Sequence, residues 1–242
     1  MQLKILFNMI KRIIDILLST IGLIVFFPII VITLILIWFQ DFSFPFYTPK
    51  RMGKNMIPFK MYKFRSMIVN ADKNGISSTS ASDIRITPIG KIIRKYKFDE
   101  ISQLINVFKG DMSLVGPRPQ VIDHVINEYS ELEKNILLVK PGITDISSIV
   151  FSDEGEILKD SLDPDHDYNV LIRPWKSRLA LLYADNNNIV MDFKLIFITL
   201  LAIVNKSYAL KMINSLLNGI TTDKVIIDVC LRNKPLVPSK HP

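Results

Sequence analysis

The chain has 242 residues, and its 30 Lys and Arg side chains outnumber its 23 Asp and Glu side chains, giving a formal net charge of +7. Hydrophobic residues make up 49% of the chain and charged residues only 22%, which excludes a disordered chain. The mean hydropathy of +0.28 is high for a water-soluble domain and indicates a membrane element. The single cysteine, Cys230, excludes a scaffold held by internal disulfides and favours a reducing compartment.

The charge is unevenly distributed along the chain. Residues 1–110 carry 16 basic and 6 acidic side chains, whereas residues 111–242 carry 14 and 17. A basic first half is compatible with nucleic acid, anionic lipid or a phosphate-bearing substrate as partner.

An uncharged apolar run extends from Ile16 to Phe39, and its 24 residues would form about 36 Å of helix, enough to cross a bilayer core of about 30 Å. Pro28 lies near its middle, where it removes a backbone donor and bends a helix. Basic residues flank the run on both sides: Lys4, Lys11 and Arg12 before it, and Lys50, Arg51 and Lys54 after it. We expect a re-entrant hairpin broken near Pro28, with both basic flanks at one membrane face. A single spanning anchor is the alternative.

Residues 49–65 are basic and contain no acidic side chain. Gly53–Asn55 is a turn signal between two stretches with apolar residues, which predicts a short hairpin. Most of these cations fit a solvated face beside lipid, and such a face can also collect an anionic substrate. Nucleic acid is disfavoured because the segment adjoins a membrane insert and carries no recognition motif.

Apolar residues recur at three- and four-residue spacing from Ile89 to Phe108, which predicts a helix closed by Gly110. Asp99 and Glu100 are adjacent within this stretch. An ordinary explanation for them is a solvated helix surface, with Lys95 four residues before Asp99.

A proline-rich loop follows, in which Pro117 and Pro119 bracket Arg118. Two prolines stiffen the loop and restrict the direction of the guanidinium, which suits bidentate recognition of a phosphate. A structural turn in which Arg118 pairs with a carboxylate is the alternative.

Four segments together carry a resemblance to a known family. They occur in the order KRIIDILLSTIGLIVFFP, FKMYKFRSM, RITPIGKIIRKYKFDEISQLINVFKGDMSLVGPRP and KPGIT. These segments resemble the bacterial sugar transferase family, the monotopic polyprenol-phosphate phosphoglycosyl transferases. The resemblance runs from Lys11 to about Leu200, and its most specific part is Arg85–Pro119.

The resemblance implies a compact, helix-rich α/β domain at the cytoplasmic face of the bacterial inner membrane, held by a re-entrant hairpin that breaks at Pro28. It implies a transferase that moves a sugar-1-phosphate from a nucleotide diphosphate sugar, for which we expect a UDP-sugar, to a polyprenol phosphate such as undecaprenyl phosphate. The products would be a polyprenyl-diphosphate-sugar and UMP, in the first membrane step of polysaccharide or glycoconjugate assembly.

The resemblance also implies roles for single residues. Asp99 would be the nucleophile that forms an aspartyl phospho-sugar intermediate, and Glu100 would be a ligand of Mg²⁺. Lys63, Arg94 and Arg118, the last in the turn of Pro117, match positions that face the substrate phosphates.

Three departures from the family pattern stand near these positions. Lys97 replaces a serine that usually lies two residues before the aspartate, and the DELPQ motif appears as Asp99–Gln103 without its proline. Asp145 replaces the usual glycine after KPGIT, in a region that we connect with the choice of sugar. The first two concern the start of the helix and leave both carboxylates in place.

Two other classes compete with this function. Asp163 and Asp165 form a D-x-D pair, which would fit a membrane-attached glycosyltransferase that releases a nucleoside diphosphate. The ordinary explanation for that pair is an acidic solvated loop. The third class is a membrane-bound scaffold without activity. The histidines form no set with metal-ligand spacing.

We divide the chain into an N-terminal segment with the hairpin (1–48), a catalytic domain (49–205) and a C-terminal extension (206–242). Residues 189–204 are expected to form a core or interfacial helix, and the residues from Asn233 to be disordered. The expected partners are the nucleotide sugar, the polyprenol phosphate and membrane lipids, with no nucleic acid.

Overall fold

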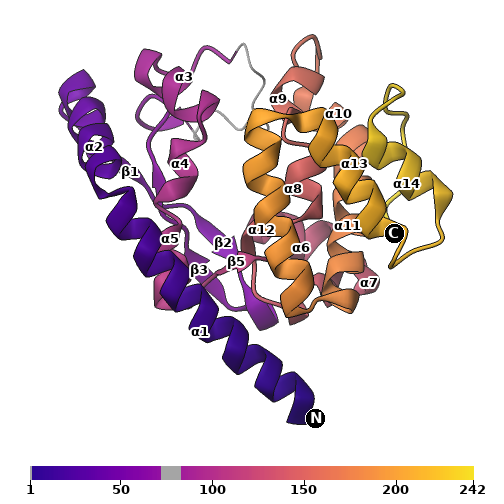
Figure 1. Ribbon diagram of the computed structural model, residues 1–242. Coiled ribbons are helices and arrows are strands. Elements are labelled where there is room, and N and C mark those ends of the chain that lie inside the picture. Colours follow the sequence, from indigo (N-terminus) through magenta and orange to yellow (C-terminus); the bar gives the residue numbers. More distant parts are fainter. Residues whose placement is uncertain (1, 72–82) are drawn as a thin grey trace.

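The computed structural model describes residues 2–71 and 83–242. In this part of the chain the fold is a helix-rich α/β domain with three small two-stranded sheets. Figure 1 shows α1 (Gln2–Val25) and α2 (Phe27–Asp41) along one edge of the molecule, and α13 (Lys206–Leu217) and α14 (Lys224–Leu231) at the other edge.

The remaining described helices are short, apart from the last two that follow. They are α3 (Pro88–Lys95), α4 (Phe98–Ile101), α5 (Leu104–Lys109), α6 (Ile122–Glu128), α7 (Glu131–Lys134), α8 (Ile146–Val150), α9 (Glu154–Ile157), α10 (Pro164–Asp167), α11 (Arg173–Asn186) and α12 (Ile189–Val204). Three shorter turns of other helix types are η1 (Lys54–Met56), η3 (Asn135–Leu138) and the π-helical η4 (Tyr168–Ile172).

The strands form two antiparallel pairs and one parallel pair. β1 (Phe46–Tyr47) pairs with β4 (Lys63–Phe64), β2 (Lys50–Met52) with β3 (Pro58–Lys60), and β5 (Ser113–Val115) runs parallel to β6 (Gly142–Thr144). The hairpin predicted within residues 49–65 is therefore present as β2 and β3. Its turn contains Asn55 and Met56 with positive φ.

The apolar run is divided as the position of Pro28 predicts. α1 and α2 meet at an angle of 61°, and Pro28 lies in the first turn of α2, where a missing backbone donor is tolerated. Taken singly, no described helix is long and apolar enough to cross a membrane, whereas this bent pair passes the same criteria of length and composition.

The buried face of α1 is polar and its exposed face is apolar. Asp15 and Ser19, one helical turn apart, are 3% and 0% exposed, whereas Ile13 and Leu17 are 55% and 57% exposed. A helix in water has the reverse arrangement. Gly22 continues the buried side, where a Cβ would lie only 2.9 Å from a methyl group of Leu104.

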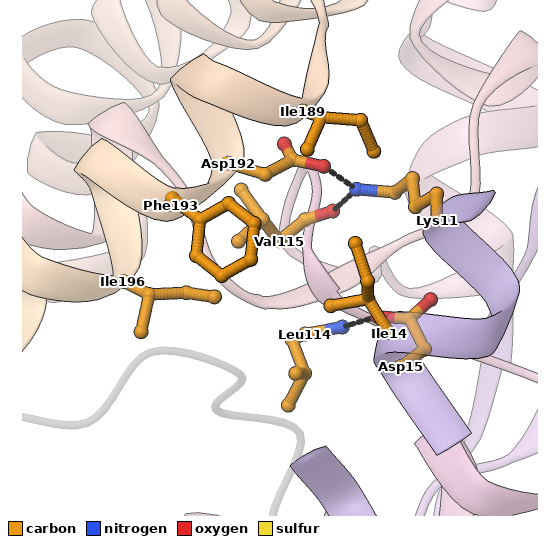
Figure 2. A pocket seen from close by; sticks show the side chains of 9 residues that line it. All are labelled: Lys11, Ile14, Asp15, Leu114, Val115, Ile189, Asp192, Phe193 and Ile196. Carbon is orange, nitrogen blue, oxygen red and sulfur yellow. Dashed lines mark hydrogen bonds and ion pairs between the residues drawn. The ribbon is translucent and has the colours of Figure 1, made fainter. Parts of the chain in front are cut away.

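Charged side chains fasten α1 to the domain. Lys11 donates to the carbonyl of Val115 at 3.0 Å and forms an ion pair with Asp192 of α12, as Figure 2 shows. Asp15 accepts hydrogen bonds from the Leu114 amide and the Ser113 hydroxyl, both at 3.0 Å. The small hollow between α1 and α12 is lined by these charged groups together with apolar side chains such as Ile14, Phe193 and Ile196 (Figure 2).

Arg12 also binds to the domain. Its guanidinium donates to the carbonyls of Val107 and Phe108, at 2.6 and 2.7 Å, where α5 ends. We expected the basic residues before the run at a membrane face, and the structure shows Lys11 and Arg12 bound to oxygen acceptors of the domain.

A small apolar cluster joins α2 to the centre of the domain. Its buried members are Ile37 of α2, Phe64 of β4 and Ile93 of α3, and Phe98 packs against them. The residue directly before Asp99 is thereby attached to the second helix of the hairpin.

The largest core lies in the C-terminal half, where α8 and α11–α14 pack around Leu179, Leu195 and Ile213. The helix predicted over residues 189–204 is present as α12. The last residues differ from the predicted disorder: the Ser239 amide donates to the carbonyl of Val170 at 2.9 Å, and Arg178 donates to that of Lys240 at 2.7 Å.

Candidate active site

The segment with the two adjacent carboxylates is not one continuous helix. The helix predicted over residues 89–108 is divided into α3, α4 and α5, and the break between α3 and α4 lies at Lys97, which adopts a left-handed conformation with φ of 54°. The break places Asp99 and Glu100 in the first turn of α4, where carboxylates are favoured.

Asp99 pairs with a lysine from a strand. Its Oδ2 lies 2.8 Å from Nζ of Lys63, and both side chains are largely buried. The partner suggested by helical spacing, Lys95, is therefore replaced by Lys63 of β4. This pair joins two of the residues predicted from the family resemblance.

Two buried polar side chains hold Lys63 in register with Asp99. The Ser102 hydroxyl donates to the carbonyl of Tyr62 at 3.1 Å, and the amide of Tyr62 donates to Oδ1 of Asn106 at 2.8 Å. Asn106 also donates to the carbonyl of Lys60 at 2.7 Å. The carbonyl and the amide of Tyr62, the residue before Lys63, are thus fixed to the residue that ends α4 and to α5.

Glu100 pairs with the arginine of the proline-rich loop. Its Oε1 lies 3.0 Å from a guanidinium nitrogen of Arg118. Burial opposes the charge of Glu100, but the cations of Arg118, Lys63 and Lys97 outweigh burial and lower the pKa of Glu100 to about 2. The charge of Glu100 in turn raises the pKa of Arg118. Both groups are therefore ionised at neutral pH.

The loop of Arg118 is fixed by the parallel pair β5 and β6. The amide of Gly116 donates to the carbonyl of Thr144 at 2.9 Å, and the amide of Gly142 donates to that of Pro117 at 3.0 Å. A Cβ on Gly142 would lie 2.1 Å from the nitrogen of Gly116, so the two strands can approach only because both residues are glycine. The VGPRP and KPGIT motifs are thus one structural unit.

Arg94 is the predicted phosphate-facing residue that lies apart from the carboxylates. It is half-exposed on α3, and its charge helps to lower the pKa of Asp83. Within residues 2–71 and 83–242, no ion pair or hydrogen bond joins Arg94 to Asp99 or Glu100.

A polar hollow lies beside Arg118, and apart from Pro117 and Arg118 the sequence did not single out its residues. Its wall contains Tyr129, Tyr168 and two further cations, Arg173 and Lys176. Arg173 forms an ion pair with Glu128, and Lys176 forms one with Glu154. These residues come from regions without a recognisable motif, so only the fold brings them beside Arg118.

The D-x-D residues have a structural setting. The carboxylate of Asp163 accepts from the amide of His166 at 3.0 Å and caps the four-residue helix α10. The pair does not follow a described strand, since β6 ends at Thr144.

The carboxylates are compatible with a magnesium ion that is bound partly by substrate. Among the residues that the structure describes, no three His, Cys, Asp or Glu side chains gather as a metal cage. Mg²⁺ is usually held by one or two carboxylates together with substrate phosphates, and Glu100 is an ionised hard ligand of that kind.

The names of three curated relatives describe the transfer of a sugar phosphate to undecaprenyl phosphate. A Bacillus subtilis (strain 168) protein is 46% identical over 111 residues, which are 46% of this chain and 62% of that protein. Its name describes it, provisionally, as an undecaprenyl-phosphate N-acetylgalactosaminyl 1-phosphate transferase. An Aeromonas hydrophila relative, 34% identical over 67% of this chain and 39% of its own length, is named UDP-N-acetylgalactosamine-undecaprenyl-phosphate N-acetylgalactosaminephosphotransferase.

A third relative, from Klebsiella pneumoniae, is 33% identical over 81% of this chain and is named UDP-glucose:undecaprenyl-phosphate glucose-1-phosphate transferase. The match covers 41% of that relative, so the chain spans between two fifths and two thirds of the length of these three proteins. The sequence profile of the family described as "Bacterial sugar transferase" matches residues 6–206. The chain belongs to the bacterial sugar transferase family.

Proposed function

We propose that the protein transfers a sugar-1-phosphate from a nucleotide diphosphate sugar to a polyprenol phosphate, with undecaprenyl phosphate as the expected acceptor. The observation that carries this proposal is the dyad itself: two adjacent carboxylates, each paired with a different cation, at the start of a helix attached to the hairpin. The names of the relatives support the same reaction. A UDP-sugar is the expected donor.

In the first step, an Oδ atom of Asp99 attacks the phosphorus that bears the sugar. A bond forms between that oxygen and phosphorus, and the bond from phosphorus to the bridging oxygen breaks. The nucleoside monophosphate leaves with the electron pair. In the second step, an oxygen of the polyprenol phosphate attacks the same phosphorus and releases the Asp99 carboxylate. Two steps conserve the energy of the diphosphate bond in an acyl phosphate.

Lys63 and Arg118 would act by exchanging partners. Without substrate they neutralise Asp99 and Glu100, at 2.8 and 3.0 Å. The phosphates of the donor compete for the same two cations, so donor binding frees the Asp99 carboxylate at the place where it is needed. The cations then offset the approach of an anionic nucleophile to an anionic diphosphate, which is the main electrostatic barrier.

Mg²⁺ is part of the proposal, with Glu100 as its protein ligand. When bound, the ion would neutralise phosphate oxygens and stabilise the leaving group. The low pKa of Glu100 keeps this carboxylate ready to bind the ion throughout the physiological range.

We further propose that α1 and α2 form a re-entrant hairpin at the cytoplasmic face of the bacterial inner membrane. Support comes from the apolar exposed face of α1 and the 61° bend. Large apolar surfaces are stable in lipid and not in water. The cluster of Ile37, Phe64 and Ile93 would then place the dyad within reach of a water-soluble donor and a lipid-bound acceptor.

Nucleotide release from a panel of UDP-sugars tests the reaction, with purified protein, Mg²⁺ and polyprenol phosphate. We expect UMP to be released by the wild type and by Asp163→Asn, and to fall by at least a thousandfold in Asp99→Asn and Glu100→Gln. Release of UDP that depends on Asp163 would instead support a D-x-D glycosyltransferase. Wild-type rates in Asp99→Asn would remove Asp99 as the nucleophile.

A further inference from the structure

Arg51 is a half-buried cation beside the candidate active site, and no carboxylate of the described residues pairs with it. It lies on β2, and the amide of the next residue, Met52, donates to the carbonyl of Gln120 at 2.9 Å. Gln120 follows Arg118 by two residues, so this bond holds β2 against the loop of Arg118. Within the described ranges, the Arg51 guanidinium takes part in no ion pair or hydrogen bond.

The surroundings of Arg51 are cationic and phenolic. Burial lowers the pKa of Arg51, and Arg118 is near enough for its charge to lower that pKa further. The other groups that act on Arg51 are the phenols of Tyr47 and Tyr168. Arg51 and Arg118 carry like charges, and an anion between them would reduce their repulsion.

Tyr168 links this position to the hollow beside Arg118, because it lines that hollow and also acts on the charge of Arg51. Tyr168 opens the π-helical turn η4, a conformation that is frequent at functional sites. The ammonium group of Lys176 lies 5.2 Å from the centre of the Tyr168 ring, and Tyr129 lines the same hollow. Two aromatic rings beside a cationic pair suit a ligand with both a flat ring and a phosphate.

We propose that Arg51 and Arg118 together bind the phosphate that leaves with the nucleotide, and that Tyr168 and Tyr129 line the place of the nucleoside. This inference rests on the proposed function. When the bridging bond breaks, the leaving phosphate gains a negative charge, whereas the phosphoryl group on Asp99 remains beside Lys63. A second cation is therefore most useful at the leaving phosphate, where charge develops.

Calorimetric binding of UMP to the full-length protein in lipid nanodiscs tests this site. A lost charge-assisted contact predicts that Arg51→Met weakens UMP binding about tenfold or more. The matched control is Lys50→Met, which removes the same charge from the adjacent, exposed position, whose side chain points to the opposite face of β2. We expect Lys50→Met to bind UMP within twofold of the wild type, and uridine to bind all three proteins equally.

Three results would overturn the site. The first is unchanged UMP binding by a folded Arg51→Met protein, with folding checked by its unfolding midpoint. The second is a wild type that binds none of UMP, CMP, GMP and AMP. The third is an Arg51→Met protein that still binds UMP but no longer binds N-acetylgalactosamine 1-phosphate. This result would place Arg51 at the sugar phosphate. Arg51-dependent UMP binding without nucleotide release from any donor would contradict the proposed reaction and leave this site standing.

Discussion

Helices α1 and α13 place the same residue types on opposite sides. In α13, Ile213 is fully buried and Lys211 is exposed, as in any helix that separates a core from water. In α1, Ile13 is 55% exposed and Lys11 reaches into a buried network. The hydrophobic effect drives apolar groups away from water only. The reversed order in α1 is therefore the expected arrangement for a helix whose outer surface meets lipid.

The largest effect should come from Lys11→Met, which leaves the buried carboxylate of Asp192 without its cation. Removing one partner of a buried pair costs about 3–5 kcal/mol. The matched change Lys211→Met removes an exposed charge from α13 and should cost less than about 0.5 kcal/mol. Denaturant unfolding in detergent measures both. Equal effects would mean that α1 is not fastened by its polar face.

The same comparison can be made with isoleucine. Ile213→Ala leaves a cavity in the C-terminal core and should cost about 2–5 kcal/mol in free energy of unfolding. Ile13→Ala should cost less than about 0.5 kcal/mol in the same detergent, because its side chain packs mainly against the medium. A large loss for Ile13→Ala would place that side chain in a protein core.

A pH titration of stability tests the ion pair between Glu100 and Arg118. Because the pKa of Glu100 is lowered from 4.5 to about 2, its stabilising contribution is complete above the unfolded-state value and disappears as pH falls through about 2. Glu100→Gln should therefore be less stable than the wild type by about 2–3 kcal/mol above pH 5, with the difference closing between pH 4.5 and 2.

Glu131→Gln is the control for this titration, since Glu131 forms an exposed ion pair with Lys134 within one helix turn. Such pairs contribute less than about 0.5 kcal/mol. A difference for Glu100→Gln that is independent of pH down to 2 would contradict the ion pair with Arg118 as its source.

The smallest effect concerns the backbone at the break before the dyad. Lys97 has φ of 54°, a conformation that costs a non-glycine residue about 1–2 kcal/mol. Lys97→Gly should stabilise the fold by about 1 kcal/mol, whereas Lys95→Gly, at the end of α3, should destabilise it by a similar amount. Thermal unfolding of the two variants should shift in opposite directions. A destabilising Lys97→Gly would show that contacts of the lysine side chain outweigh the strain.

The sequence contains enough information to predict the bend near Pro28, the hairpin of β2 and β3, and helix α12, because each depends on local signals. It also identifies Lys63, Asp99, Glu100 and Arg118, which the structure brings together in two ion pairs. The break at Lys97 was not predictable, since apolar spacing does not report the backbone conformation of a single residue.

Other features depend on contacts between distant segments. A cation beside an apolar run has the same appearance whether it faces headgroups or a buried carboxylate, so Lys11 was misplaced. Arg51 and Lys50 are equivalent in the sequence, and only the packing of β2 against the segment at Gln120 brings Arg51 near Arg118. Arg94 matches a family position but lies apart from the dyad in this structure.

The central claim is that the Asp99 carboxylate carries the phospho-sugar between donor and acceptor. Intact-protein mass spectrometry after brief exposure to donor and Mg²⁺, without polyprenol phosphate, tests it most directly. The account predicts a mass increase equal to one sugar phosphate on Asp99, absent in Asp99→Asn and removed when polyprenol phosphate is added. Wild-type protein that turns over the donor without this adduct, or an adduct that persists in Asp99→Asn, would contradict the account.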